Sequence, residues 1–253
     1  MKKKVVIDSG FQTGNNHDKF NYLLNTSLTN IQSIELIYAS IPNSMYVFQT
    51  GINDTITFNE GGGNLTSLIA AGNYSDTNLA LELTQKMTAT SLASGLGLTY
   101  TVTNSDVSVN NSTHRFRFSC TGAFSIIASA NQFPLEQIGF TSGTFVSSLV
   151  GAENLIFSST QYNLLPPPYL YLTIKNFSDE IVTANSHCNG QFLLPLQGES
   201  YQLANFQKNM FFISKLNVFS QGLNEFSIEL LNPDGRNPGL KIRWMAIFEI
   251  TCN

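Results

Sequence analysis

Apolar and polar residues alternate with a period of two along much of this chain, and this pattern limits what the chain can fold into. The alternation is clearest over residues 98–103, 169–175 and 226–230, where an apolar or aromatic residue occupies every second position. Successive side chains of a β-strand point to opposite faces, so such a segment buries one face and exposes the other. The sequence therefore predicts an all-β protein built from half-buried strands.

Turn-forming residues separate these segments. Pro42-Asn43-Ser44 ends the first long apolar segment, because proline has no N–H to donate to a sheet, and Asn232-Pro233-Asp234-Gly235 breaks the chain before the last one. Between such turns we expect about nine or ten strands, as in an antiparallel sandwich. The predicted strands lie at residues 31–41, 54–58, 98–103, 115–118, 169–175, 191–196, 211–219, 226–230 and 240–251. In the last of them one face is shared by Ile242, Trp244, Ala246, Phe248 and Ile250.

One segment has a helical period instead. Leu79, Leu83 and Met87 recur every four residues, and the Ser75 hydroxyl can accept a hydrogen bond from a free N–H of the first turn. The sequence predicts one inserted helix over residues 75–92, with a further helical turn within residues 133–140.

The length of 253 residues suits one all-β domain. Residues 1–30 are mostly polar and lack a strand pattern after Ile7, so we interpret them as an N-terminal arm. Residues 31–253 are then expected to form a single domain.

Charged residues make up only 12% of the chain, about half of the usual share of roughly 25%. Uncharged polar residues replace them, which favours contacts with other proteins over repulsion from them. The net charge is −4, so there is no basic surface typical of specific nucleic-acid binding. No apolar stretch approaches the roughly 18 residues of a membrane span, and residues 1–10 lack the apolar core of a secretory signal. We expect no membrane insertion, and synthesis in the cytosol.

The histidines and cysteines do not form a pattern typical of a metal or catalytic site. His187 and Cys188 are adjacent, and adjacent residues of a strand point to opposite faces, so they do not make a ligand pair. The others are isolated in the sequence: His17, His114, Cys120 and Cys252. We expect no metal site, no cofactor and no catalytic residue.

Carboxylates could still meet in the folded chain and hydrolyse a glycoside. The candidates are Glu35, Glu82, Glu136, Glu199 and Glu229. Glu35 and Glu229 lie at positions predicted to face solvent, and Gly61–Gly63 lacks the Lys-Ser/Thr that follows in a phosphate-binding loop. The sequence favours a protein that is not an enzyme, with a glycosidase or lyase as an open alternative.

Several short motifs occur in a specific order over most of the chain. They are Glu35–Asn43 (ELIYASIPN), Gly72–Ser75 (GNYS) before the predicted helix, Gln137–Phe140 (QIGF), Pro168–Leu172 (PYLYL) and the Asp234-Gly235 turn before Trp244. In this order the chain resembles the single jelly-roll penton, or minor capsid, proteins of virophages, Polinton-like viruses and nucleocytoplasmic large DNA viruses. Each motif is short, and their order carries the resemblance.

The resemblance implies a fold class and a role. The fold would be a single jelly-roll antiparallel β-sandwich with one inserted helix. The role would be that of a structural capsid protein, a homopentamer at the vertex that contacts the major capsid protein and other minor capsid proteins. Such a protein resides in the virion and is made in the host cytoplasm or a viral factory. The chain is too short for the two jelly-rolls of a major capsid protein.

A second function stays open, a carbohydrate- or receptor-binding β-sandwich module of a spike or lectin-like protein. Aromatic residues make up 11% of the chain and could stack on sugars. Their alternation in strands is more typical of a core or of subunit contacts.

Overall fold

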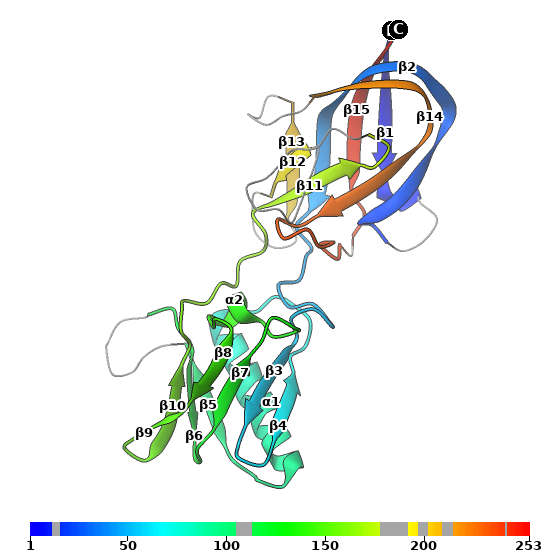
Figure 1. Ribbon diagram of the computed structural model, residues 1–253. Coiled ribbons are helices and arrows are strands. Elements are labelled where there is room, and N and C mark those ends of the chain that lie inside the picture. Colours follow the sequence, from blue (N-terminus) through cyan, green and yellow to red (C-terminus); the bar gives the residue numbers. More distant parts are fainter. Residues whose placement is uncertain (12–15, 105–112, 178–191, 197–201, 209–214, 241) are drawn as a thin grey trace. The chain divides into compact units, whose positions relative to one another are not determined.

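The computed structural model describes residues 1–11, 16–104, 113–177, 192–196, 202–208, 215–240 and 242–253. Its regular structure is nearly all β-strand, and the strand pairs in the described residues are antiparallel (Figure 1). The predicted all-β antiparallel class is confirmed.

The chain divides into two compact units. Unit 1 consists of Met1–Met45 and Pro166–Asn253, and unit 2 consists of Tyr46–Leu165. The prediction of one domain over residues 31–253 is therefore wrong, because a complete second unit interrupts the first.

The predicted arm over residues 1–30 is also wrong. Strand β1 (Lys2–Asp8) pairs with β15 (Met245–Cys252), and β2 (Lys19–Pro42) continues through residue 30. In β1 only Ile7 is fully buried, so a strand at the edge of a sheet needs little apolar sequence. Strand β1 therefore shows no clear alternation of apolar and polar residues, and the sequence pattern did not predict it.

Unit 1 is a two-layered sandwich. Its remaining strands are β11 (Tyr169–Ile174), β12 (Phe192–Pro195), β13 (Leu203–Gln207) and β14 (Lys215–Leu231). One layer has the order β1-β15-β2-β13 and uses the second half of β2; the other has the order β2-β14-β11-β12 and uses the first half. Two four-stranded layers with long crossing connections make a jelly-roll. The single jelly-roll is confirmed. In the sequence, unit 2 is inserted between its strands β2 and β11.

Strand β2 passes from one layer to the other, accompanied by β14, and irregular residues mark the bend. Asn30 has a left-handed φ of 52°, which asparagine tolerates better than most residues. The β14–β2 register shifts between Asn217 and Ser220 and again between Leu223 and Glu225. Such bulges bend a strand and allow it to switch layers.

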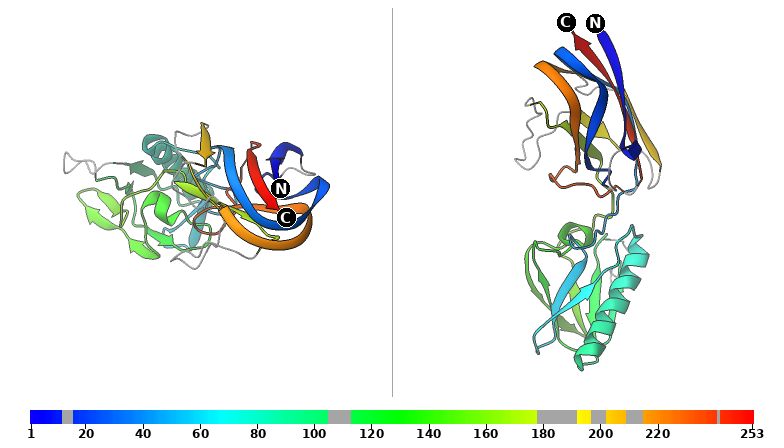
Figure 2. Two further views of the ribbon diagram at one scale, coloured as in Figure 1. Left: turned by 90° about the horizontal axis from the view of Figure 1, so that it is seen from above. Right: turned by 90° about the vertical axis from the view of Figure 1, so that its right-hand side faces the viewer.

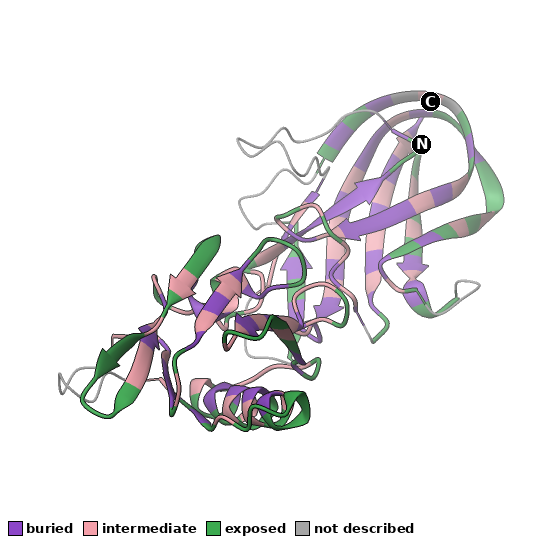
Figure 3. Ribbon diagram, turned by 60° about the horizontal axis from the view of Figure 1, so that its bottom comes forward, coloured by how far each residue is buried: buried purple, intermediate pink, exposed green. Residues whose placement is uncertain are grey.

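The core of unit 1 lies between the two layers, where buried and less buried residues alternate along the strands (Figure 3). Phe20 packs on Trp244 with ring centroids 5.8 Å apart, and Phe226 stacks on Phe248 at 6.3 Å. Trp244, Ala246, Phe248 and Ile250 are buried as predicted. Ile242 is exposed, because it precedes the first paired residue of β15 and the alternation does not extend to it.

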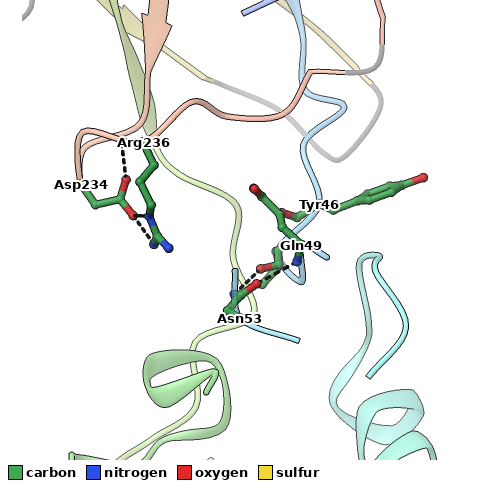
Figure 4. Close-up of polar contacts among 6 residues, drawn as sticks. Tyr46, Gln49, Asn53, Asp234 and Arg236 are labelled. Carbon is green, nitrogen blue, oxygen red and sulfur yellow. Dashed lines mark hydrogen bonds and ion pairs between the residues drawn. The ribbon is translucent and has the colours of Figure 1, made fainter. Parts of the chain in front are cut away.

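Two aspartates hold the connection between β14 and β15. The buried Asp18 carboxylate accepts hydrogen bonds from the N–H groups of Gly239 (2.8 Å) and Leu240 (3.0 Å). Asp234 accepts from the backbone and the guanidinium of Arg236 within the exposed turn (Figure 4). The predicted breaker at residues 232–235 is thus a turn.

Unit 2 contains two four-stranded sheets and the long helix α1 (Asp76–Ser94). One sheet has the order β4-β3-β7-β8 and the other β5-β6-β10-β9. Their strands are β3 (Thr55–Asn59), β4 (Asn64–Leu68), β5 (Tyr100–Thr103), β6 (Arg117–Cys120), β7 (Ser125–Ala128), β8 (Gly143–Val146), β9 (Ser148–Val150) and β10 (Glu153–Phe157). The core of unit 2 consists of residues of this unit alone.

The predicted helix over 75–92 is confirmed within two residues at its end. The Ser75 hydroxyl accepts a hydrogen bond from the N–H of Asn78, and Gly95 ends the helix with a φ of 86°. Leu79, Leu83 and Met87 are buried as the period of four predicts. Helix α1 runs along one side of unit 2 (Figure 2).

The predicted helical turn is the short helix α2 (Leu135–Ile138), which ends at Gly139 with a φ of 73°. A Cβ at residue 139 would lie 2.3 Å from the carbonyl oxygen of Thr160, so only glycine fits there.

A small network of hydrogen bonds lies at the beginning of unit 2. The N–H of Gln49 donates to the Asn53 side chain (2.8 Å), which donates in turn to the carbonyl of Val47 (2.8 Å), and the Gln49 amide donates to the carbonyl of Tyr46 (3.1 Å; Figure 4). These bonds fix the turn that leads to β3.

Two predicted strands lie partly outside the described residues. The strand at 191–196 is described from residue 192 and the strand at 211–219 from residue 215, and both described parts are β-strand.

Candidate interaction surfaces

The histidines take structural positions in the described residues. His17 Nδ1 lies 3.1 Å from the hydroxyl of Ser9, and His114 Nδ1 lies 3.3 Å from the hydroxyl of Tyr162. His187 and Cys188 fall outside the described residues. Within the described part, no three His, Cys, Asp or Glu residues gather as metal ligands.

A partly buried polar cluster lies in unit 2. The Tyr100 hydroxyl donates to one Glu60 oxygen (2.8 Å) and the Ser91 hydroxyl to the other (3.0 Å). Burial raises the pKa of Tyr100, and Glu60 adds to this effect. Burial also raises the pKa of the Cys120 thiol. The two hydrogen bonds to Glu60 connect the loop after β3 to β5 and to helix α1.

A second polar group lies at the beginning of α1. The Tyr162 hydroxyl donates to Asp76 at 2.9 Å. This bond, with further bonds from Asn104 and Thr77, lowers the pKa of Asp76, while burial and the same carboxylate raise the pKa of Tyr162 to about 12. A carboxylate held ionised at this position stabilises the positive end of the helix dipole.

The candidate glutamates each have partners where the structure describes them. Glu35 pairs with Lys208 at 2.9 Å, Glu82 with Lys86 at 3.8 Å, and Glu136 accepts from the Asn163 amide. Glu199 lies outside the described residues.

Glu229 differs from the prediction that it faces solvent, because it is only 8% exposed. It pairs with Lys175 at 2.8 Å and with Lys19 at 3.5 Å. Burial alone would raise the pKa of Glu229, but the hydrogen bond and charge of Lys175, with the charge of Lys19, outweigh burial and lower it. The alternation did not reveal these ion pairs, because Lys19 lies in β2 and Lys175 directly after β11, both far from Glu229 in the sequence.

The aromatic residues are mostly core residues. In unit 2, Tyr100 packs edge-on against Phe58 (5.3 Å) and Phe124 (5.2 Å), and all three are buried. Of the large apolar side chains that are well exposed in the described residues, only Phe11 is aromatic. The described aromatics therefore do not form an exposed platform for stacking on sugars.

Helix α1 seals one side of unit 2. Its Thr84 and Thr88 hydroxyls accept hydrogen bonds from the N–H groups of Val102 (2.8 Å) and Tyr100 (3.1 Å), and Ser91 accepts from Leu98 (2.8 Å). Thr84 and Thr88 are four residues apart, a rise of about 6 Å along a helix. Their partners are two residues apart, about 6.6 Å along a strand, so donors and acceptors have nearly the same spacing. The edge strand β5 thus has its free N–H groups satisfied by the helix.

The same helix also contacts β4, the edge of the other sheet. The Ser67 hydroxyl donates to the hydroxyl of Thr90 at 2.8 Å and to the Lys86 carbonyl at 3.2 Å. Helix α1 therefore protects an edge of both sheets against pairing with another strand.

Within the described residues, no further strand pairs with the opposite edges, β8 and β9, and we call them open. Val146, Leu149 and Val150 are 73%, 69% and 58% exposed there. No charged residue occurs from Gln137 to Ala152. Proteins usually protect edge strands with charged residues, so an uncharged apolar edge indicates an interaction surface. The predictions from alternation missed it, although the uncharged run was visible in the sequence.

Unit 1 has a groove of about 270 Å³ between β1 and the first half of β2. Lys3, Lys4 and Val6 line one wall, and Leu23 and Asn25 are among the residues of the other. The two walls belong to strands that do not pair with each other in the described structure, so the sandwich is open along this side.

Helices long and apolar enough to cross a membrane are absent from the part of the chain that the structure describes.

Comparison with known proteins gave similarity to solved structures only. No family model and no curated protein matches the chain. The chain is similar over 100% of both lengths to the crystal structure of the mavirus penton protein, with a TM-score of 0.47 and 7% identity. It is similar to a chain in the cryo-EM structure of the Sputnik virophage, with a TM-score of 0.37, 9% identity and 98% of both chains covered.

Proposed function

We propose that this chain is a structural protein of a viral capsid, and that five copies form the vertex. It would reside in the virion, be made in the host cytoplasm or a viral factory, and contact the major capsid protein and other minor capsid proteins. It would not act as an enzyme, insert into a membrane or bind a specific nucleic acid.

The observation that carries the proposal is the open edge of unit 2. The order of motifs in the sequence led to the same expectation. Val146, Leu149 and Val150 are exposed on an uncharged edge, whereas the opposite edge is sealed by α1. A protein that works as a single copy would gain nothing from such an edge and would risk aggregation. A protein that assembles with defined neighbours uses it.

The polar clusters support a structural role. The Glu60 and Asp76 groups connect elements of the fold, and their hydroxyl and thiol partners are held protonated. The low share of charged residues, 12%, reduces repulsion between copies.

Assembly of the purified chain tests the proposal. We expect mass photometry to show a species of five times the 27.9 kDa chain mass at raised protein concentration. Negative-stain electron microscopy should show rings with five-fold symmetry. Co-expression with the major capsid protein of the same virus should incorporate the chain into shells.

A chain that stays monomeric at every concentration, forms no rings and is not taken up into shells would contradict the proposal. Binding to specific sugars on a glycan array, in the absence of assembly, would favour the carbohydrate-binding alternative instead.

A further inference from the structure

Helix α1 has two apolar faces, and only one of them is covered within unit 2. Leu79, Leu83 and Met87 point into the core. Leu81 and Leu92, three turns apart on the outer face, are 55% and 71% exposed, and Leu96 just after the helix is 50% exposed. We call Leu81, Leu92 and Leu96 the outer leucines. A surface helix normally presents a polar outer face, so the outer leucines indicate a contact outside unit 2.

The surroundings of the outer leucines carry no unbalanced charge. Glu82 and Lys86 are the charged residues in the middle of α1, and they pair with each other at 3.8 Å. Gln85 and Ala89, which lie between Leu81 and Leu92 on the exposed face, are uncharged. In Figure 3 the helix shows exposed segments beside buried ones along its length.

The open edge β8–β9 lies on the opposite side of unit 2. In one sheet β4 and β8 are the two edge strands, and in the other sheet β5 and β9 are. Helix α1 packs on β4 and β5. Unit 2 therefore carries one uncharged apolar surface on each of two opposite sides.

We propose that unit 2 of one copy binds unit 2 of the next copy head to tail, with the outer leucines of one against the β8–β9 edge of its neighbour. This contact deepens the proposed vertex function, on which it rests, by naming an interface between copies.

A second copy of this chain fits both surfaces at once. Both are apolar, and the charged residues beside them are already paired, Glu82 with Lys86 and Glu153 with Arg117. A charged partner would therefore lose solvation without gaining an ion pair. Pairing of two β8–β9 edges would form a two-fold dimer and leave the outer leucines exposed on both copies. A head-to-tail contact covers both surfaces of every copy with a single kind of interface, and such a contact closes into a ring when the rotation fits.

Two variants test the contact, one on each surface. Leu92→Lys places a charge among the outer leucines, and Leu149→Lys places one on the β8–β9 edge. Both side chains are exposed within unit 2, so both variants should fold, which helix circular dichroism checks. A charge in the contact should weaken assembly by about tenfold or more. We expect each variant alone to stay monomeric where the unaltered chain forms rings.

The mixture of the two variants is the decisive sample. The Leu92→Lys copy keeps an intact edge, and the Leu149→Lys copy keeps intact outer leucines, so one good contact remains between them. We expect an equimolar mixture to form dimers containing one copy of each variant, and no rings, in sedimentation velocity and native mass spectrometry. Thr101→Lys, on the exposed face of β5, is the control and should assemble normally.

The outcomes separate this inference from the vertex proposal. If the unaltered chain forms rings and both variants do so equally well, the head-to-tail contact is wrong and the vertex role stands. If Leu92→Lys alone forms stable dimers, the edges pair with each other and the inference is wrong. If the mixture stays monomeric, the two surfaces do not bind one another. A chain that never assembles, altered or not, contradicts the vertex role itself.

Discussion

Each unit contains a residue whose identity is constrained by one close contact. In unit 1 the buried Glu229 is held ionised by Lys175 and Lys19, although burial opposes its charge. In unit 2 the carbonyl oxygen of Thr160 lies so close to Gly139 that the Cβ of any other residue would clash with it. Both residues are far in sequence from the groups that constrain them, so sequence patterns could not identify either constraint.

Replacing Lys175 with methionine should destabilise unit 1 by about 1–3 kcal/mol at neutral pH, because a buried carboxylate loses its nearer partner. The folded pKa of Glu229 lies below its ordinary value. Its contribution is therefore present above the unfolded pKa and is lost as the pH falls through the folded pKa. The difference between the unaltered chain and the variant should shrink on acidification to about pH 3, as measured by urea unfolding.

Arg236→Met is the control for this prediction, because its partner Asp234 is exposed. An exposed pair contributes about 0–1 kcal/mol, so this variant should unfold almost like the unaltered chain. A difference for Lys175→Met that stays constant with pH would contradict the role given to Glu229.

Gly139→Ala should destabilise unit 2 by at least about 2 kcal/mol, because its Cβ would meet the Thr160 carbonyl at 2.3 Å. Gly95→Ala is a matched control: its φ of 86° is also left-handed, but no atom lies within 4 Å of its added Cβ. The control includes the backbone strain without the clash. Equal losses in the two variants, measured by thermal unfolding of the helix signal, would show that the clash is relieved without cost.

Among the elements, strands with one apolar face and the long helix could be predicted from the sequence. The spacing of Leu79, Leu83 and Met87 located α1, and alternation located β5, β11 and most of β15. Alternation missed β1 and the first half of β2, where few side chains are buried and the surface is largely polar. It also missed β8 and β9, whose side chains are mostly exposed, because the strand pattern reports burial rather than hydrogen bonding.

The hydroxyls of α1 that seal β5 should contribute measurably. Thr88→Val keeps the shape of the side chain but leaves the Tyr100 N–H without its acceptor, which should cost about 1–3 kcal/mol. Amide hydrogen exchange at Tyr100 should accelerate accordingly. Thr101→Val, on the exposed face of the same strand, should change neither quantity. Unchanged exchange at Tyr100 in Thr88→Val would mean that the helix does not protect this edge.

At the scale of the whole molecule, the class and the jelly-roll could be predicted, but the division into two units could not. The motifs that suggested one jelly-roll lie in both units. The breaker Pro42-Asn43-Ser44 and the prolines at 166–168 do lie at the two boundaries, but the breaker at residues 232–235 lies inside unit 1, so a breaker alone does not identify a unit boundary. The boundary depends on which strands pair, and β2 pairs with strands that follow it by well over a hundred residues.

The separate cores predict that the units respond separately to core mutations. Trp244 is the only tryptophan and is buried in unit 1, so its fluorescence reports on that unit, while α1 dominates the helix signal of unit 2. Phe58→Ala should destabilise unit 2 by about 3–5 kcal/mol and shift the helix transition, with little change in tryptophan fluorescence. Phe248→Ala should do the reverse. Coincident shifts of both signals in either variant would show that the two units unfold as one.

The interruption of the jelly-roll also sets an order of events on the ribosome. Unit 2 is contiguous and can fold as soon as its last residue emerges. Strand β2 must wait for β13, β14 and β15, which at about 5–20 residues per second means a delay on the order of ten seconds. For that time a 24-residue strand stands unpaired beside its nascent neighbours. The first half of β2 is largely polar, so that half offers little apolar surface for pairing with another nascent chain.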